Sequence, residues 1–430
     1  MSAFAARPAS RVVAGARLGS WLWGRARLEW TARLSRALRE APTRAALSRA
    51  GFWGREGPRL ERYLATIQRG FPGEGCPPGW EPGTGAGAAA DSRSGAGASV
   101  FLRAVHWNIL KGIAFDGVLA WLRDHPRLAE ADFLFLNEAD AGMARSGNRH
   151  VAAELAASLN LHWAFLPAHL ELTKGPGPDA GAPGENVLGL QGVAILSRRP
   201  PLALRGVRLP ECFDMFAFHE KRYGGRCALI AAFAGGLVLA AVHLEVRHSP
   251  ACRAIQMRAL LESIEDFVGE EGRAGRPVRG VLIAGDLNTH TFARNSLPAA
   301  LRGLLRTAVT PAAMLRAGLL EPWRGRREPL FAELARRGYR WEGLNDRHPT
   351  AAERLGNVEE LGLVPGWLGR GLLSACGLRE RRIELRLDWF AGRGIRPVAT
   401  ALAVTAGELT DEALPSDHLP ICLAFTLEDS

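Results

Sequence analysis

Short apolar runs separated by turn residues and amphipathic segments dominate the chain from residue 100 onward. They have the length and composition of β-strands, and they span residues 100–109, 132–138, 192–197, 227–244, 280–286, 383–390 and 419–427. The pair Gly235–Gly236 splits the fourth run, which therefore predicts a hairpin. Apolar residues three and four apart predict helices over 149–159 and 251–268. Because hairpins and crossovers are mixed, we expect an α/β domain with mixed or antiparallel sheets.

The first 64 residues form a basic segment with thirteen arginines, no lysine and four acidic residues, and they carry most of the net charge of +10. Apolar residues recur three and four apart within residues 27–39, which predicts an amphipathic helix. Three interpretations stay open. The helix packs on the main domain, lies on a membrane surface with the tryptophans of residues 21–30, or belongs to a targeting segment.

Composition divides the chain into three parts. Residues 1–80 are the basic, mostly helical N-terminal extension, and residues 81–99 are a linker of Gly, Ala and Ser that buries too little apolar surface to order itself. Residues 100–430 hold the predicted strands, and we expect them to form one large domain. Its charge is close to neutral, so composition alone does not demand a nucleic-acid surface.

Membrane and redox signals are weak. No apolar run reaches the roughly 18 residues of a membrane span, and arginines interrupt the place where a secretory signal would have its apolar core. The six cysteines are far apart, without a CxxC pair, and predict neither a zinc site nor a disulfide framework. We therefore expect a cytoplasmic protein whose cysteines are mostly buried and reduced.

Polar side chains stand at the ends of most predicted strands. They are Asn108, Asn137, Glu138, His243, Asp286, Asn288, Asp388, Asp417 and His418. A turn explains any one of them, and the stretch GDLN at residues 285–288 is typical of a turn. Their repetition over six strand ends instead predicts a functional site.

The ordered motifs WNI, LNE, GVAILSRRP, VHLE, GDLN, RLDWF and SDHLP, between residues 100 and 427, resemble the endonuclease/exonuclease/phosphatase superfamily. That group includes pancreatic-type deoxyribonuclease, abasic-site endonucleases, neutral sphingomyelinases and inositol polyphosphate 5-phosphatases. The resemblance implies a four-layer α/β/β/α sandwich of two mixed, mainly antiparallel sheets flanked by helices. It also implies a metal-dependent phosphoesterase in which Asp388 holds His418 and His243 acts on the leaving group. Asn137 departs from the usual Gln, and Leu287 from the usual Phe.

The chemistry of phosphate-ester hydrolysis assigns the metal ligands. A hard divalent cation with oxygen ligands neutralises charge on the phosphoryl group, and Mg²⁺ prefers such a shell, with Mn²⁺ as a substitute. Glu138 is the best single ligand, Asn108 helps to hold the metal or a phosphate oxygen, and Asp417 is a further carboxylate.

Asp286 is predicted to orient or deprotonate the attacking water, while Asn288 fixes that acid or the phosphate. His418 is the second functional group, and the residues leave open whether Asp286 or His418 is the base.

The substrate stays open between nucleic acid and phospholipid, and the sequence indicates no protein partner. The function predicted first is a magnesium-dependent phosphodiesterase. The alternatives are a sphingomyelinase-like phospholipid phosphodiesterase or phosphomonoesterase at a membrane surface, contacted through the N-terminal helix, and a binding protein without activity. Arg149 is a candidate phosphate-binding residue, although the segment around it also reads as a helix start capped by Asn148.

Overall fold

A computed structural model describes residues 25–72, 101–218, 220–293, 296–354, 371, 374, 382–403 and 414–428. The predicted linker at 81–99 lies outside these residues, as do the tryptophans at 21 and 23.

The larger sheet has eight strands in the order β1–β4–β5–β3–β2–β15–β14, with β7 paired to β4. Its strands are β1 (Gln68–Gly70), β2 (Leu102–Asn108), β3 (Phe133–Ala141), β4 (His162–Glu171), β5 (Leu190–Ser197), β7 (Arg222–Gly224), β14 (Ile395–Ala403) and β15 (Ile421–Leu427). Strands β2 and β3 run parallel, and the other described pairs in this sheet are antiparallel.

The second sheet has five strands in the order β13–β10–β9–β8–β6. They are β6 (Ala203–Arg208), β8 (Cys227–Phe233), β9 (Leu237–His243), β10 (Gly280–Asp286) and β13 (Asp388–Arg393). Strands β9 and β10 run parallel, and the β8–β9 hairpin turns at Gly235 and Gly236, both with positive φ, as predicted. Strands β11 (Ala351–Arg354) and β12 (Arg382–Leu385) form a separate ribbon.

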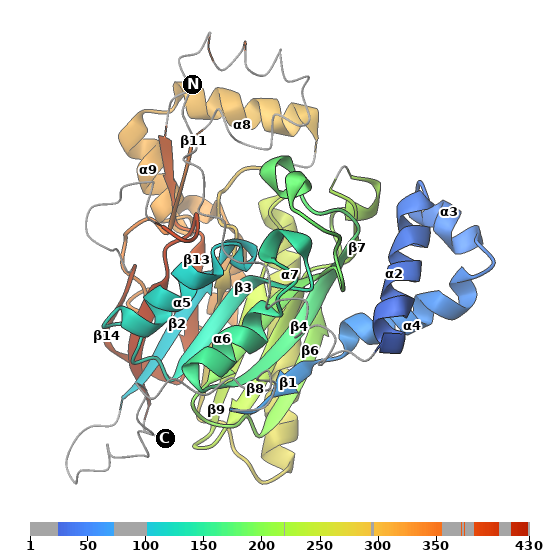
Figure 1. The fold of residues 1–430 in the computed structure, drawn as a ribbon. Coiled ribbons are helices and arrows are strands. Elements are labelled where there is room, and N and C mark those ends of the chain that lie inside the picture. Colours follow the sequence, from blue (N-terminus) through green and yellow to red (C-terminus); the bar gives the residue numbers. More distant parts are fainter. Residues whose placement is uncertain are drawn as a thin grey trace.

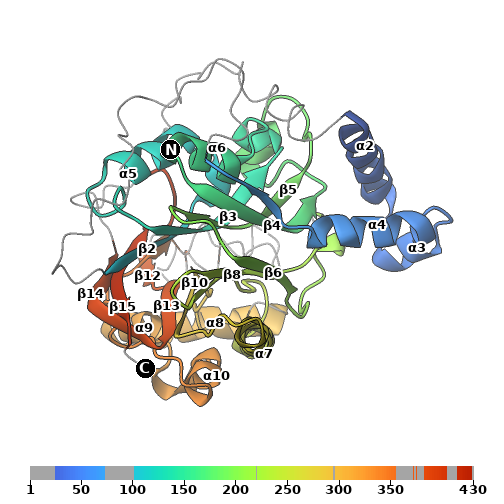
Figure 2. The same ribbon diagram turned by 90° about the horizontal axis from the view of Figure 1, so that it is seen from below.

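The two sheets pack face to face, and helices cover their outer faces (Figure 2). Phe135 from one sheet meets Phe390 from the other in the core between them. Helices α5 (Phe115–Asp124) and α6 (Val151–Leu159) cover the larger sheet, and α7 (Pro250–Arg273) and α10 (Leu330–Arg336) cover the smaller one. The predicted four-layer sandwich is confirmed.

The remaining helices lie at the periphery (Figure 1). They are α2 (Arg25–Glu40), α3 (Arg44–Arg49) and α4 (Trp53–Ala65) at the N-terminus, and α8 (Leu297–Val309) and α9 (Ala312–Leu320) after β10. Short 3-10 turns occupy Leu110–Gly112, Ala144–Ser146, Gly177–Gly181, Met215–Ala217 and Arg324–Arg326.

The described part of the N-terminal extension, from residue 25, is mostly helical, and it packs on the main domain. Trp30, Leu34 and Leu38 are buried in the same core cluster as residues of the larger sheet, and the Trp30 indole donates to Glu56 at 2.7 Å. After α4, strand β1 adds to the edge of the larger sheet beside β4. The apolar side of α2 is therefore buried, which leaves its arginines for contacts with solvent.

Two expectations about strands need correction. The predicted strand 383–390 is two strands, because β12 pairs with β11 while β13 pairs with β10. The chain passes from one to the other at Arg386, whose buried guanidinium pairs with Asp346. Strand β4 was not predicted, since Pro167 and two histidines break its apolar pattern. The structure accommodates the proline with a register shift after Pro167.

The prediction that the cysteines are reduced is wrong for one pair. Cys212 and Cys252 form a disulfide that joins the loop after β6 to the first turn of α7, which disagrees with a reduced state for these two residues. Cys227 is free and buried, as expected.

Within the described residues, none of the helices is both long and apolar enough to cross a membrane.

Candidate active site

The site forms where five strands from the two sheets meet at their ends. In the larger sheet, the parallel pair β2 and β3 places Asn108 opposite Asn137. In the smaller sheet, β10 lies between β9 and β13, so Asp286 stands opposite both His243 and Asp388. The register of these strands brings together residues that are up to 280 positions apart in the sequence.

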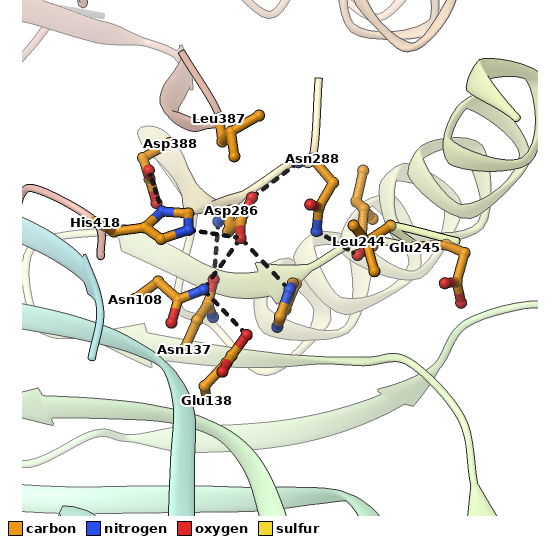
Figure 3. Close-up of polar contacts among 12 residues, drawn as sticks. Asn108, Asn137, Glu138, Leu244, Glu245, Asp286, Asn288, Leu387, Asp388 and His418 are labelled. Atoms are coloured by element: carbon orange, nitrogen blue, oxygen red, sulfur yellow. Dashed lines mark hydrogen bonds and ion pairs between the residues drawn. The ribbon is translucent and has the colours of Figure 1, made fainter. Parts of the chain in front are cut away.

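Two asparagines join the sheets at this point (Figure 3). The Asn137 side-chain oxygen accepts the backbone N–H of Asp286 at 2.8 Å. The Asn108 side-chain nitrogen donates to Asp286 Oδ2 at 3.1 Å and to Glu138 Oε1 at 3.3 Å. The two carboxylates predicted to do the chemistry are thus oriented by one amide.

His418 lies between two carboxylates (Figure 3). Its Nδ1 is 2.7 Å from Asp388 Oδ2, and its Nε2 is 3.9 Å from Asp286 Oδ2. Burial alone would lower the pKa of His418, but the charge and hydrogen bond of Asp388, followed by the charge of Asp286, raise it well above its ordinary value. We therefore expect His418 to be protonated at neutral pH.

Asp388 is held from two sides. Besides its contact with His418, Asp388 forms a hydrogen bond of 2.8 Å between its Oδ1 and His106 Nε2, and all three residues are buried. Burial would raise the pKa of Asp388, but His418 and His106 outweigh it and lower the pKa. Asp388 is therefore an anion that holds His418 in one orientation.

Asp286 has the opposite electrostatic character. Burial, and secondly repulsion from Asp388, raise its pKa to about 7 against the attraction of His418. A carboxylate with a pKa near neutrality is suited to accept a proton. The predicted base therefore has both the position and the proton affinity for that role.

The stretch GDLN is a turn as well as a part of the site. The backbone N–H of Asn288 donates to Asp286 Oδ1 at 2.9 Å, and Asn288 has a φ of 50°. Its side-chain nitrogen donates to the carbonyl of Leu244 at 2.9 Å. This turn occupies Oδ1 of Asp286 and leaves Oδ2 directed toward Asn108 and the histidines.

His243 is close to the other side of the same oxygen. Its Nε2 lies 3.5 Å from Asp286 Oδ2. Burial, together with the positive charges of Arg226 and His418, holds the pKa of His243 well below its ordinary value. The two histidines beside Asp286 are therefore in different protonation states, one neutral and one positively charged.

The raised pKa of Asp286 predicts a pH-dependent stability. The ordinary pKa is 3.8 and the folded value is about 7, so between these values the folded protein holds a proton that the unfolded chain has lost. The contribution of Asp286 to the free energy of unfolding therefore decreases as the pH rises through this window. Melting in EDTA at about pH 5 and about pH 8 should show that Asp286→Asn gains stability relative to wild type at the higher pH. An equal difference at both values would contradict the raised pKa.

Glu138, Asn108 and Asp417 provide oxygen atoms for a metal. Burial would raise the pKa of Glu138, but Lys111, His418 and the Asn108 hydrogen bond outweigh it and lower the pKa. Desolvation of its carboxylate by the surrounding protein raises the pKa of Asp417, and the negative charge of Glu138 raises it further. Two carboxylates that repel each other would fit a hard divalent cation. Asn108 directs its side-chain nitrogen toward Glu138, and its side-chain oxygen accepts the N–H of Leu110 at 3.2 Å.

A second group of potential ligands lies next to the first. One ligand atom each from Asp286, Asp388 and His418 falls within 4.8 Å of the others, so this part of the site can also hold a metal ion. The 2.7 Å contact between His418 and Asp388 favours a proton-handling role for these two residues instead.

Most of the non-glycine residues with positive φ lie near the site residues in the sequence. Among the described residues they are Leu110, Lys111, Glu138, Asn288 and Thr291, with φ angles between 45° and 65°, while Asn148 and Asn160 adopt such angles elsewhere. Such conformations are costly for residues other than glycine, and they cluster where a function requires them. In Glu138 this conformation coincides with a register shift between β3 and β5, directly after Asn137.

Two contributors were not predicted from the sequence, and a third was given no role. His106 lies two residues before Asn108 on β2, and this spacing, which places both side chains on one face of a strand, was the signal for it. Asn137 was predicted as one of the polar residues at strand ends but was assigned no role. Lys111 gave no signal, because its effect on Glu138 depends on the turn at Leu110–Gly112.

Two predictions about the segment 145–150 are not supported by its contacts. Arg149 pairs with Glu154 at 2.6 Å and lies over the ring of Phe115 instead of contacting the site residues. Asn148 does not cap helix α6, because His150 accepts from the N–H of Ala153 in that place. The Asn148 amide instead holds the backbone of residues 185 and 187.

Comparison with known proteins gives one family. The model of the Endonuclease/Exonuclease/phosphatase family matches residues 105–418, a stretch that contains the site from Asn108 to His418. A search of curated proteins found no match.

Several solved structures are similar to the chain. An endonuclease/exonuclease/phosphatase from Beutenbergia cavernae has 18% identity and a TM-score of 0.41, covering 76% of this chain and 72% of that chain. The human Nocturnin catalytic domain with bound sulfate has 16% identity and a TM-score of 0.40, covering 76% and 94%. The 3'-5' exonuclease NExo from Neisseria meningitidis has 17% identity and a TM-score of 0.40, covering 76% and 100%.

Proposed function

Because the chain belongs to the endonuclease/exonuclease/phosphatase family, whose enzymes hydrolyse phosphate esters, we propose that it is a magnesium-dependent phosphodiesterase. The observation that carries the proposal is the placement of Asp286. It is a buried carboxylate with a pKa of about 7, between a neutral histidine and a protonated one. This arrangement supplies a proton acceptor and a positive charge to one small space.

In the proposed reaction, water attacks phosphorus and the bond to the leaving oxygen breaks. Asp286 takes the proton of the attacking water through Oδ2, since Oδ1 is held by the amide of Asn288. His418, kept in orientation by Asp388, stabilises the negative charge that develops on the phosphoryl oxygens. Because His418 is already protonated, the role of base falls to Asp286.

Four further side chains complete the proposal. His243 faces the leaving group, where its neutral imidazole forms a hydrogen bond to the departing oxygen. Glu138, Asn108 and Asp417 would hold Mg²⁺, which would supply additional charge neutralisation at the phosphoryl group. Enzymes of this family depend in general on divalent metal ions.

Metal removal tests this proposal. Hydrolysis of bis(p-nitrophenyl) phosphate should stop in EDTA and return when Mg²⁺ or Mn²⁺ is added. Glu138→Ala should raise the Mg²⁺ concentration that gives half-maximal activity by about tenfold or more, because it removes the main carboxylate ligand. Glu185→Ala removes an exposed glutamate and should leave that concentration unchanged. Full activity in EDTA would overturn the metal assignment.

A phospholipid phosphodiesterase is the second candidate. The exposed apolar residues of helix α8 favour it over a nuclease.

A further inference from the structure

Helix α8 turns its large apolar side chains toward solvent. Leu297, Leu301, Leu305 and Val309 recur every four residues, which places them in one row, and their exposed fractions are 41%, 39%, 64% and 71%. They form almost half of the exposed large hydrophobic residues among the described ones. On a helix of an ordinary soluble domain, such a row faces the core.

The buried residues of α8 whose side chains the structure describes are small. Ala300 and Thr307 are buried, and a Cβ atom at Gly303 would lie in van der Waals contact with Phe292, 3.4 Å from its ring. Among these described residues, the small side chains therefore face the protein and the four large aliphatic ones face solvent.

The charges around the row have a single sign. Residues 297–320, which span α8 and α9, contain three arginines and no acidic residue. Arg302 and Arg306 are exposed on α8, while Arg316 on α9 pairs with Glu384. Met314 on α9 extends the apolar surface, with 61% of the residue exposed. Apolar residues flanked by cations and free of acids match a surface of anionic lipid.

Helix α8 is also connected to the active site. Phe292, on which it rests, follows Asn288 by four residues and packs against a cluster that includes Leu387, the neighbour of Asp388. Ala351 of the same cluster forms a β-bridge with His418. Figure 1 shows α8 and α9 beside β11, over one end of the sandwich. A surface that binds α8 would thus be held near the catalytic residues.

We propose that α8 inserts its apolar row into an anionic lipid surface, so that the active site acts on phosphate esters held at that surface. The assignment of a lipid substrate rests on the proposed phosphodiesterase function, whereas the binding of α8 to lipid does not. The N-terminal helix α2 cannot present an apolar row in the same way, because its leucines are buried against the domain. A nucleic acid offers no apolar layer that would cover four aliphatic side chains.

The test uses sedimentation of the full chain with vesicles of phosphatidylcholine alone or mixed with phosphatidylglycerol. The wild type should bind the mixed vesicles. The affinity of Leu305→Gln/Val309→Gln for these vesicles should be lower by about tenfold or more, because two exposed apolar side chains are lost. Hydrolysis of soluble bis(p-nitrophenyl) phosphate and the melting temperature should stay unchanged.

A matched control makes the same chemical change elsewhere. Leu202 and Ile255 are exposed to 52% and 47% but lie on other elements, so Leu202→Gln/Ile255→Gln should bind vesicles like the wild type. Equal losses in both double variants would overturn the proposal, as would a wild type that stays in the supernatant. A wild-type dimer that Leu305→Gln/Val309→Gln converts to a monomer would overturn it in favour of a second copy of the chain.

The two proposals fail in different ways. Vesicle binding without hydrolysis of any phosphodiester would overturn the proposed function but would support the binding of α8 to lipid. Hydrolysis of the soluble ester without vesicle binding would overturn the binding of α8 to lipid but would support the proposed function.

Discussion

Asp286→Asn should lower kcat on bis(p-nitrophenyl) phosphate by on the order of 100-fold or more while the protein stays folded. The substitution keeps the shape of the side chain and removes the negative charge and the proton acceptor. The hydrogen bond from the Asn288 amide to position δ1 remains available, so the turn can persist. Single-turnover rates at saturating Mg²⁺ would separate a loss of chemistry from a loss of binding.

The matched control is Asp132→Asn. Asp132 precedes β3 and accepts the backbone N–H of Arg103 at 2.8 Å, so it is also an aspartate that holds a backbone amide, but it lies at the opposite end of the strand from Glu138. Its replacement should leave kcat unchanged. If Asp286→Asn also turned over normally, the stretch GDLN would be a turn alone and the proposed mechanism would be wrong.

His418→Ala should cause a loss of similar size, on the order of 100-fold in kcat. The variant loses the positive charge that would face the phosphoryl oxygens. It also changes Asp286, because His418 lowers the pKa of that carboxyl. Without this attraction, the acidic limb of the pH profile of kcat should move to higher pH, and a merely structural role of His418 would not produce that movement.

The control for this variant is His348→Ala. His348 contacts Asp346 at 2.9 Å through Nδ1, as His418 contacts Asp388, but it is largely exposed. Its loss should change neither kcat nor the pH profile. The double variant Asp286→Asn/His418→Ala should lose much less than the product of the single losses, since the two residues act as a unit. Independent, multiplicative losses would contradict a shared role.

The site was predictable where a short motif carried its own chemistry. Most strands of the predicted set had a polar residue at or next to one end, and the order of these motifs identified Glu138, Asp286, Asp388 and His418 without any knowledge of the strand register. What could not be predicted depends on contacts between distant segments. The spacing from Asn108 gives the strand face of His106, but its partner Asp388 is known only from the packing of β2 against β13.

Other features needed the tertiary structure as well. Cys212 and Cys252 are 40 residues apart, and only the path of the loop after β6 brings them together. The apolar residues of α8 form a regular helical pattern, but the sequence does not tell which face of a helix is turned to solvent. The structure shows it, because Ala300 is buried while Leu305 and Val309 are exposed.

The strand β1 has a consequence for how the chain is made. Its partner β4 starts at residue 162, so a ribosome must add roughly 90 residues after Gly70, on the order of ten seconds of synthesis, before the pair can form. Helices α2 and α4 can associate earlier through Trp30 and Tyr63, whose rings meet at 5.4 Å. Helices α2 and α4 are therefore synthesised well before the sheet edge on which β1 pairs, and Leu64 stays exposed until that edge has formed.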